Sequence, residues 1–203
     1  MTRDSLIASA RELFLKYGIK SVSMDDIARL LGISKKTIYT FVDNKSELVE
    51  ESIMAFIQEE CDVVNQITKT SNNAIEEISA IARYVIGSLR KMKPTLMYDL
   101  QKYHNKAWSV LQEMHFKNIE ATIGQNIKRG IEEGFYRDDL DAFIQSKIYV
   151  GLARILVDEE VFPSSNFERS YLYKHLMKYH LNGIINDKGR NELKKHFNKE
   201  QLG

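Results

Sequence analysis

Apolar side chains recur every three to four positions along most of the chain, a spacing typical of amphipathic helices. Ser23 and Ser34 directly precede the second and third of these amphipathic segments, and each can cap a helix by accepting hydrogen bonds from backbone amides. Gly18 and Gly32 directly follow the first and second amphipathic segments. The pattern predicts helices over residues 6–17, 24–31, 35–41, 45–67, 75–92, 96–131 in two pieces divided near 103–108, 141–157 and 167–185. A polar tail follows from residue 187 onward.

Composition supports an all-α fold. The 203 residues include only 10 Gly and 2 Pro, about half the usual share, so turns must be few and helices long. The formal net charge of +1 argues against a strongly basic nucleic-acid binder, unless the positive charge is concentrated locally. The single cysteine, Cys61, is expected to be a small buried residue rather than a redox sensor. We see no secretory leader and no run of about 18 uncharged apolar residues, and we expect a cytoplasmic protein.

The segment from Met24 to Phe41 has the spacing of a helix-turn-helix. Ala28 is small enough for the third helix to cross over it, Gly32 suits a tight left-handed turn, and Ile38 is expected to pack back between the two helices. These inward positions leave a short polar and basic face on the third helix, formed by Lys35, Lys36, Thr37, Tyr39 and Thr40. Such a face fits a DNA major groove, although basic residues on a short helix can also be simply solvated.

The residues Met24-Asp25-Asp26-Ile27-Ala28, Gly32 through Phe41, Lys45 and Glu47-Leu48 resemble the TetR/AcrR family of bacterial transcriptional regulators. The resemblance covers about the first 50 residues. It implies a three-helix DNA-binding domain over residues 1–47 and a larger helical domain over residues 48–203 that binds a ligand and dimerises. Lys36 departs from the pattern, because the family often has a small residue there.

The resemblance also implies a role for each matching side chain. Ser34 and Thr37 are expected to bind phosphates, although helix capping alone explains Ser34. Tyr39 and Lys45 are expected to bind the phosphate backbone as well. The candidates for contacts with base edges are Lys35, Lys36 and Thr40, since lysine can donate to guanine and a threonine methyl can meet a thymine methyl.

The last two predicted helices are apolar over a wide arc, as expected for helices covered by a second chain as well as by their own domain. A central helix of a monomeric bundle is the alternative. A symmetric dimer presents two recognition helices to DNA, which favours the first interpretation. The candidate dimer residues are Ile148, Gly151, Leu152, Ile155, Leu172, Leu176, Tyr179 and Gly183.

Large adaptable side chains gather between residues 92 and 116, and they suit either an effector pocket or an ordinary helical core. The candidate effector contacts are Met97, Tyr103, His104, Trp108, His115 and Tyr149. We predict no metal site, no cofactor and no catalytic residue, because the sequence has no ligand cluster, phosphate loop or nucleophile motif.

These observations predict a homodimeric regulator that binds a palindromic DNA operator and is released by a small apolar or aromatic effector of unknown identity. It is expected to be a repressor, with no membrane partner. Two alternatives stay open, namely a ligand-independent DNA-binding protein and a small-molecule-binding helical protein without a DNA function.

Overall fold

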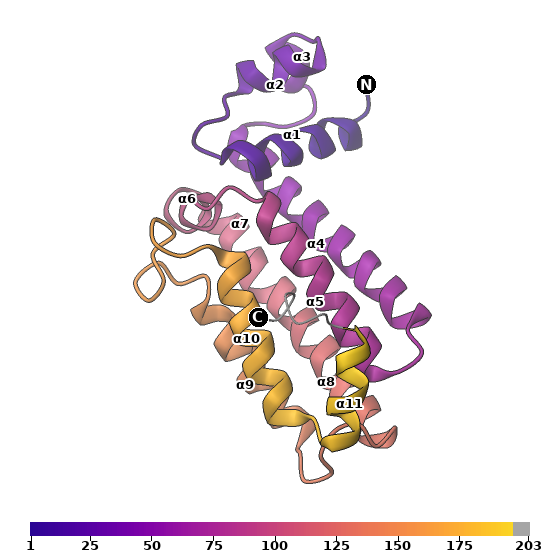
Figure 1. Cartoon of the computed structure of the whole chain (residues 1–203). Coiled ribbons are helices and arrows are strands. Elements are labelled where there is room, and N and C mark those ends of the chain that lie inside the picture. Colours follow the sequence, from indigo (N-terminus) through magenta and orange to yellow (C-terminus); the bar gives the residue numbers. More distant parts are fainter. Residues whose placement is uncertain (197–203) are drawn as a thin grey trace. The chain divides into compact units, whose positions relative to one another are not determined.

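The computed structural model describes residues 1–196, which fold into helices without a sheet (Figure 1). An isolated antiparallel bridge joins Tyr136 and Ile185. Within these residues no helix is both long and apolar enough to span a membrane. The helices are α1 (Arg3–Tyr17), α2 (Met24–Leu31), α3 (Lys35–Ile38), α4 (Lys45–Thr70), α5 (Ala74–Lys91), α6 (Leu96–Tyr103), α7 (Asn105–Val110), the π-helical turn η1 (Leu111–His115), α8 (Phe116–Glu132), α9 (Ala142–Ile155), α10 (Arg169–Ile184) and α11 (Asp187–His196).

The chain folds into two compact units. Unit 1 combines Met1–Cys61 with Lys91–His115, and unit 2 combines Asp62–Arg90 with the chain from Phe116 onward. Helix α4 therefore contributes to both units. The sequence predicts that residues 1–47 bind DNA and that residues 48–203 bind the effector. This functional division stays a prediction.

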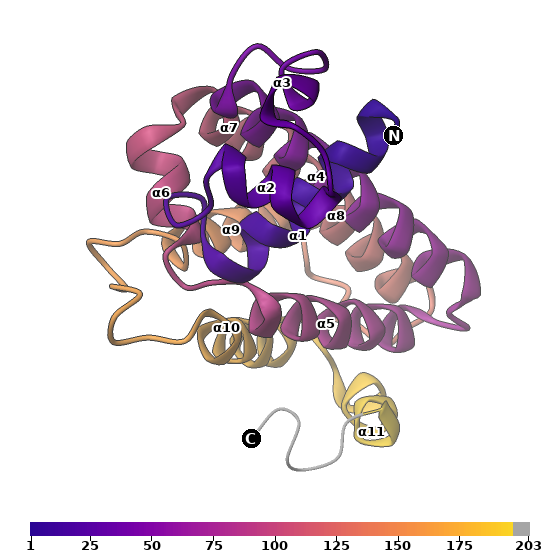
Figure 2. The ribbon, with the colours of Figure 1, turned by 90° about the horizontal axis from the view of Figure 1, so that it is seen from above.

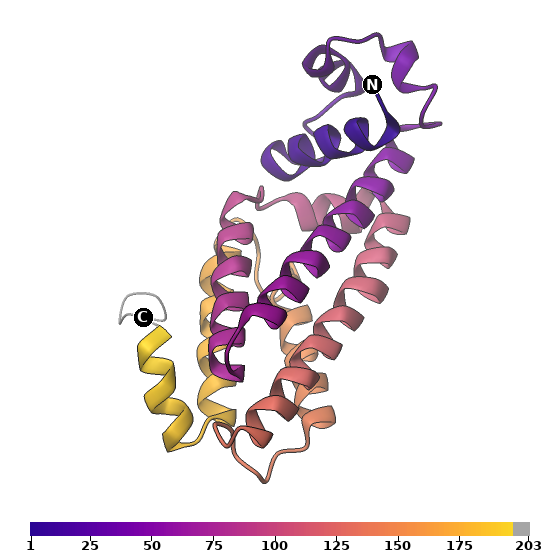
Figure 3. The ribbon, with the colours of Figure 1, turned by 90° about the vertical axis from the view of Figure 1, so that its right-hand side faces the viewer.

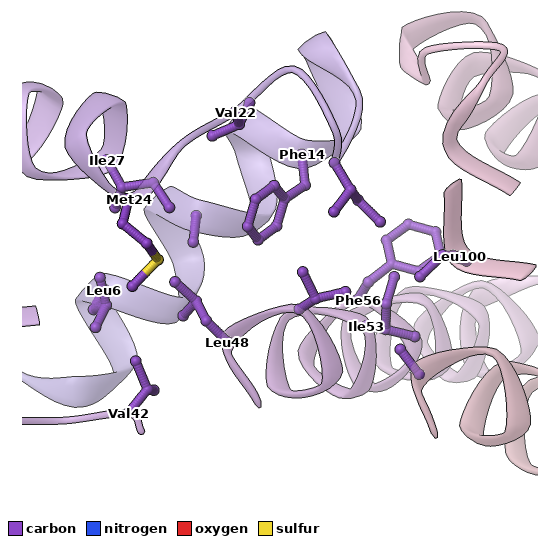
Figure 4. Close-up of a cluster of buried hydrophobic side chains, with 14 of the residues drawn as sticks. Leu6, Phe14, Val22, Met24, Ile27, Val42, Leu48, Ile53, Phe56 and Leu100 are labelled. Atoms are coloured by element: carbon purple, nitrogen blue, oxygen red, sulfur yellow. The ribbon is translucent and has the colours of Figure 1, made fainter. Parts of the chain in front are cut away.

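Unit 1 is built around an apolar cluster in which α1 lies against the first half of α4. Leu6 and Phe14 lie on the same face of α1, and both are almost completely buried. Figure 4 shows them converging with Met24, Ile27 and Leu48. Residues of α6 and α7 complete the same cluster, so the helix-turn-helix is anchored on a core that is larger than its own three helices.

Unit 2 has its own core, formed by one face each of α5, α8, α9 and α10. Figures 2 and 3 show α5 and α10 side by side. The Tyr136 hydroxyl donates to Asn126 Oδ1 over 2.8 Å, and the Asn126 amide donates to the Ala74 carbonyl over 2.9 Å. These buried polar groups are therefore satisfied inside the core.

The helices differ from the predicted ones in three places. Helix α3 ends at Ile38 rather than at Phe41 and continues only as a turn. The break at His104 lies within the predicted range near residues 103–108, but the unpredicted turn η1 separates α7 from α8. Helix α11 lies in the polar tail, for which the sequence pattern indicated no helix. The Asn186 side chain accepts the Gly189 amide over 2.9 Å, and the backbone of Gly189 packs closely against the Phe135 carbonyl, which only a residue without a side chain allows.

Candidate DNA-binding surface

Helix α2 begins and ends where its local sequence dictates. Ser23 Oγ accepts the Asp26 amide over 3.2 Å, and the Asp26 carboxylate accepts the Ser23 amide over 2.9 Å, which is a complete capping box. The Ser23 hydroxyl also donates to the Asp26 carboxylate over 2.6 Å, and this bond, together with the one from the Ser23 amide, lowers the pKa of Asp26. At the other end Gly32 has φ 65° and ψ 31°, the left-handed conformation that was predicted for the turn. The direction in which the chain enters α3 is therefore fixed.

Helix α3 is held by one buried side chain and one cap. Ile38 is completely buried, and Ala28 beneath the crossing is 7% exposed. Ser34 Oγ accepts the Thr37 amide over 3.0 Å and lies 2.8 Å from Thr37 Oγ1, so both hydroxyls already have a partner within the helix. The Thr40 hydroxyl donates to the Thr37 carbonyl over 2.7 Å. These contacts give the predicted DNA-binding face a defined geometry.

The side chains of this face differ in how they are held. Lys35 Nζ donates to the Asp25 carboxylate over 3.0 Å, and this hydrogen bond raises the pKa of Lys35. Lys36 is exposed and forms no ion pair with any residue from 1 to 196. Tyr39 is 43% exposed although it is aromatic. The surface therefore carries one tethered lysine, one solvated lysine and one accessible phenol.

Lys45 occupies the first position of α4, and its ammonium has a partner in the protein. Nζ donates to the Ile19 carbonyl over 2.6 Å and lies 5.9 Å from the centre of the Phe14 ring. Burial lowers the pKa of Lys45, although Asp99 and Asp26 act in the opposite direction. In the absence of DNA this lysine secures the connection between α1 and α2, and its contact with a phosphate stays a prediction.

Residues 6–52, which contain this helix-turn-helix, match the family model described as bacterial regulatory proteins, tetR family. This amino-terminal segment belongs to the tetR family. YhgD of Bacillus subtilis, an uncharacterized HTH-type transcriptional regulator, is 27% identical over 154 residues, which cover 72% of this chain and 80% of YhgD. The transcriptional repressor KstR2 of Mycobacterium tuberculosis is 24% identical over 146 residues, which cover 68% of this chain and 71% of KstR2. The matched segment and these relatives thus indicate transcription regulation through DNA binding.

Two solved structures share the fold of this chain over most of its described residues. The structure of KstR2, described as a ketosteroid transcriptional regulator of Mycobacterium tuberculosis, matches with a TM-score of 0.59 at 19% identity, covering 91% of this chain and 95% of KstR2. SmeT in complex with triclosan matches with a TM-score of 0.64 at 16% identity, covering 99% of this chain and 96% of SmeT. The all-α prediction is confirmed.

The expected effector contacts of this chain lie in both units. Met97 and Trp108 are partly buried and pack against the core of unit 1. Tyr103 is 46% exposed and lines, with His104, a hollow of about 390 Å³ whose other residues include three carboxylates. In unit 2 the Tyr149 hydroxyl lies 3.3 Å from that of Tyr173, and burial raises the pKa of Tyr149 to about 12. The structure does not gather these side chains at one site.

His115 ends η1 and belongs to a buried pair. Its Nδ1 lies 3.3 Å from Oε2 of Glu60 on α4. Burial raises the pKa of Glu60 to about 8, with a smaller effect of Glu59 in the same direction, and burial lowers the pKa of His115 to about 4. Both groups are therefore neutral near pH 7, and the contact is not an ion pair.

Helices α9 and α10 expose apolar surface at most of the expected dimer residues. Ile148 is 48% exposed, Ile155 43% and Tyr179 72%, and no atom lies near a Cβ built on Gly151 or Gly183. Phe143 and Ile144 extend this α9–α10 face. Leu152 is partly buried, whereas Leu172 and Leu176 lie inside the core of unit 2, so they have little surface left for a partner.

A hollow of about 690 Å³ lies between α9 and α10 on the same face. Its lining includes Ile148, Tyr179 and His180. The buried His180 Nε2 has no hydrogen-bond partner among residues 1–196, and burial lowers the pKa of His180 to about 4. His180 was not among the predicted site residues, because no local sequence pattern distinguishes a buried imidazole from an exposed one.

Sequence reasoning also missed two acidic residues of unit 1. Asp25 binds Lys35 although ten positions separate them. Buried Asp99 on α6 accepts the Lys20 amide over 3.0 Å, 79 positions away in the chain. Asp25 could have been found from the charge pattern of the helix-turn-helix, whereas Asp99 had no sequence signal.

Proposed function

We propose that the chain is a homodimeric repressor that binds a palindromic operator and releases it when a small apolar or aromatic effector binds. The observation that carries the proposal is the division of α3 between the buried anchor Ile38 and the exposed side chains around it. Lys35, Lys36 and Thr40 read base edges, while Ser34, Thr37, Tyr39 and Lys45 bind phosphates.

The α9–α10 face supports the homodimer. Exposed apolar patches of this kind mark protein interfaces, and open glycines allow helices of two chains to approach closely. A two-fold axis through such a face gives two symmetrically placed recognition helices, which accounts for a palindromic site. Ile148, Gly151, Leu152, Ile155, Tyr179 and Gly183 form the contact in this proposal.

Effector response is supported by the family relationship and by the residues around α6 and α7. Met97 and Trp108 offer apolar contacts, and His104 and His115 offer neutral imidazoles. KstR2 is described as a ketosteroid transcriptional regulator and SmeT as a complex with triclosan, which favours apolar ring compounds as the class of effector. An effector acts by binding one conformation of the dimer better than the DNA-binding one.

The test begins with selection of operator sequences from a random duplex pool by the full chain. We expect one pseudo-palindromic site that binds two chains, with an affinity that falls linearly on a log–log plot against salt concentration. Tyr39→Phe should weaken the selected duplex and a scrambled duplex equally, because a phosphate contact carries no sequence information. A specific loss for one of the two duplexes would contradict the assignment of Tyr39.

Effector response is tested by adding neutral aromatic and steroid compounds to the protein–operator complex. Release of DNA by one of them, and repression of a promoter carrying the site during in vitro transcription, are the expected results. A selected site whose affinity no compound changes would favour a ligand-independent DNA-binding protein. Compound binding without enrichment of any DNA sequence would favour the helical small-molecule binder.

A further inference from the structure

Two neighbouring lysines of α3, the proposed recognition helix, have different electrostatic surroundings. Lys35 Nζ lies 3.0 Å from Asp25 Oδ2, and both side chains are exposed, 46% and 62% respectively. Lys36, one position later, forms no ion pair with any residue of the described chain. Asp25 is in the first turn of α2, so the pair spans the two helices of the motif.

The carboxylate of Asp25 has two consequences for DNA binding. Its negative charge repels phosphates at short range, which opposes binding to any duplex. It also occupies the ammonium of Lys35, which is a flexible point charge that would otherwise reach any nearby phosphate. A binding duplex must therefore offer Lys35 an acceptor that replaces Asp25 or is shared with it.

We infer that Asp25 is a specificity-determining residue, which holds Lys35 on the α2 side of the motif and keeps it from binding phosphates indiscriminately. Lys35 then contributes to binding only where a base edge presents an acceptor within reach of the tethered ammonium. This inference rests on the proposed role of Lys35 in base reading. Asp25 then lowers the affinity for non-operator sequences more than the affinity for the operator. Because specificity is the difference between these two binding free energies, the carboxylate increases it.

The test is Asp25→Asn, measured as the affinity for the selected duplex and for a scrambled duplex over a range of salt concentrations. For the scrambled duplex we expect affinity to rise about three- to tenfold and the salt slope to steepen by about one unit, as for one additional phosphate contact. For the selected duplex we expect a smaller gain. The ratio of the two affinities should therefore fall several-fold.

Three further variants separate positioning of Lys35 from the general effect of charge. Asp43→Asn removes a negative charge from an exposed residue in the segment between α3 and α4, and it should raise both affinities equally and leave their ratio unchanged. Asp25→Glu keeps the charge and should restore the ratio. In the Lys35→Ala background, Asp25→Asn should no longer change the ratio, whereas in the Lys36→Ala background it should still do so.

The outcomes distinguish this inference from the proposed function. If the wild-type chain selects no sequence, the proposed function fails. If it selects a sequence and Asp25→Asn behaves like Asp43→Asn, only the role of Asp25 is refuted. Thermal unfolding of each variant shows whether the amino end of α2 is intact, because an acid in the first helical turn also stabilises the helix.

Discussion

At the scale of single residues, Lys45 has two roles that compete. Its ammonium binds the Ile19 carbonyl in the free protein, and it is proposed to bind a phosphate in the complex. Lys45→Met keeps most of the apolar stem and removes the charge. We expect the free energy of unfolding to fall by about 1–2 kcal/mol, as for loss of a charged hydrogen bond. Urea unfolding measures this loss.

The same variant tests the phosphate contact. Lys45→Met should weaken both the selected and the scrambled duplex and reduce the salt slope by about one unit. Loss of stability with unchanged affinity for DNA would restrict Lys45 to its structural contact with Ile19. Lys20→Met is the control, since it removes a neighbouring exposed lysine while the Lys20 amide keeps its bond to Asp99.

The pair of Glu60 and His115 makes stability depend on pH in two directions. The pKa of Glu60 is about 8 in the folded chain, above its ordinary value of 4.5, so the folded state loses stability as pH rises from 4.5 to 8. The pKa values of His115 and His180 are about 4, below the ordinary 6.5, so stability also falls as pH drops from 6.5 to 4. Between pH 4.5 and 6.5 the two histidines outweigh the one glutamate, and above 6.5 only the glutamate acts, so stability should be greatest near pH 6.5.

Glu60→Gln removes the first of these effects. The variant should gain stability relative to wild type as pH rises, on the order of a few kcal/mol at pH 8, because no buried carboxyl then has to ionise. Unfolding curves between pH 5 and 8 measure the difference. Glu59→Gln, at a 55% exposed neighbour paired with Arg11, should change the pH dependence only slightly, because Glu59 makes the smaller contribution to the raised pKa of Glu60. Parallel curves for wild type and Glu60→Gln would contradict the assigned pKa.

At the scale of elements, local sequence determined most helix ends and distant packing determined the exceptions. Ser23, Gly32 and Ser34 act within four residues of themselves, so their caps and turn were predictable. The end of α3 at Ile38 and the π-helical turn before α8 depend on how each segment packs, which a helical period cannot reveal. The contact of Lys45 with Ile19 was unpredictable for the same reason, since it follows from the fold of unit 1.

Helix α8 provides a test of close packing between elements. A Cβ at Gly130 would overlap the ring of Tyr136, whose hydroxyl is fixed by Asn126 in the core of unit 2. Gly130→Ala should therefore destabilise the chain by about 2–4 kcal/mol, despite the better helix propensity of alanine. Gly87→Ala in α5 is the control, because nothing lies within 4 Å of its Cβ, and it should stabilise by up to about 1 kcal/mol. Equal effects in thermal unfolding would contradict the overlap.

At the scale of the whole molecule, dimerisation and DNA affinity should be linked through the α9–α10 face. Ile148→Glu places a charge in the proposed interface, where desolvation opposes association. We expect sedimentation to detect monomers at concentrations where the wild type is dimeric. Met54→Glu is the control, since Met54 is similarly exposed, 45% against 48% for Ile148, and lies on α4 outside this face.

Because the recognition helix is in unit 1 and Ile148 is in unit 2, the monomeric variant should keep an intact helix-turn-helix. Its affinity for a duplex with one half-site should therefore equal that of the wild type, while its affinity for the full palindrome should fall at least about tenfold, because the second half-site is no longer bound by a linked partner. Fluorescence anisotropy with the two duplexes measures both affinities. Equal losses on both would mean that the substitution disturbs the DNA-binding unit itself, and no loss on the palindrome would mean that the dimer forms through another surface.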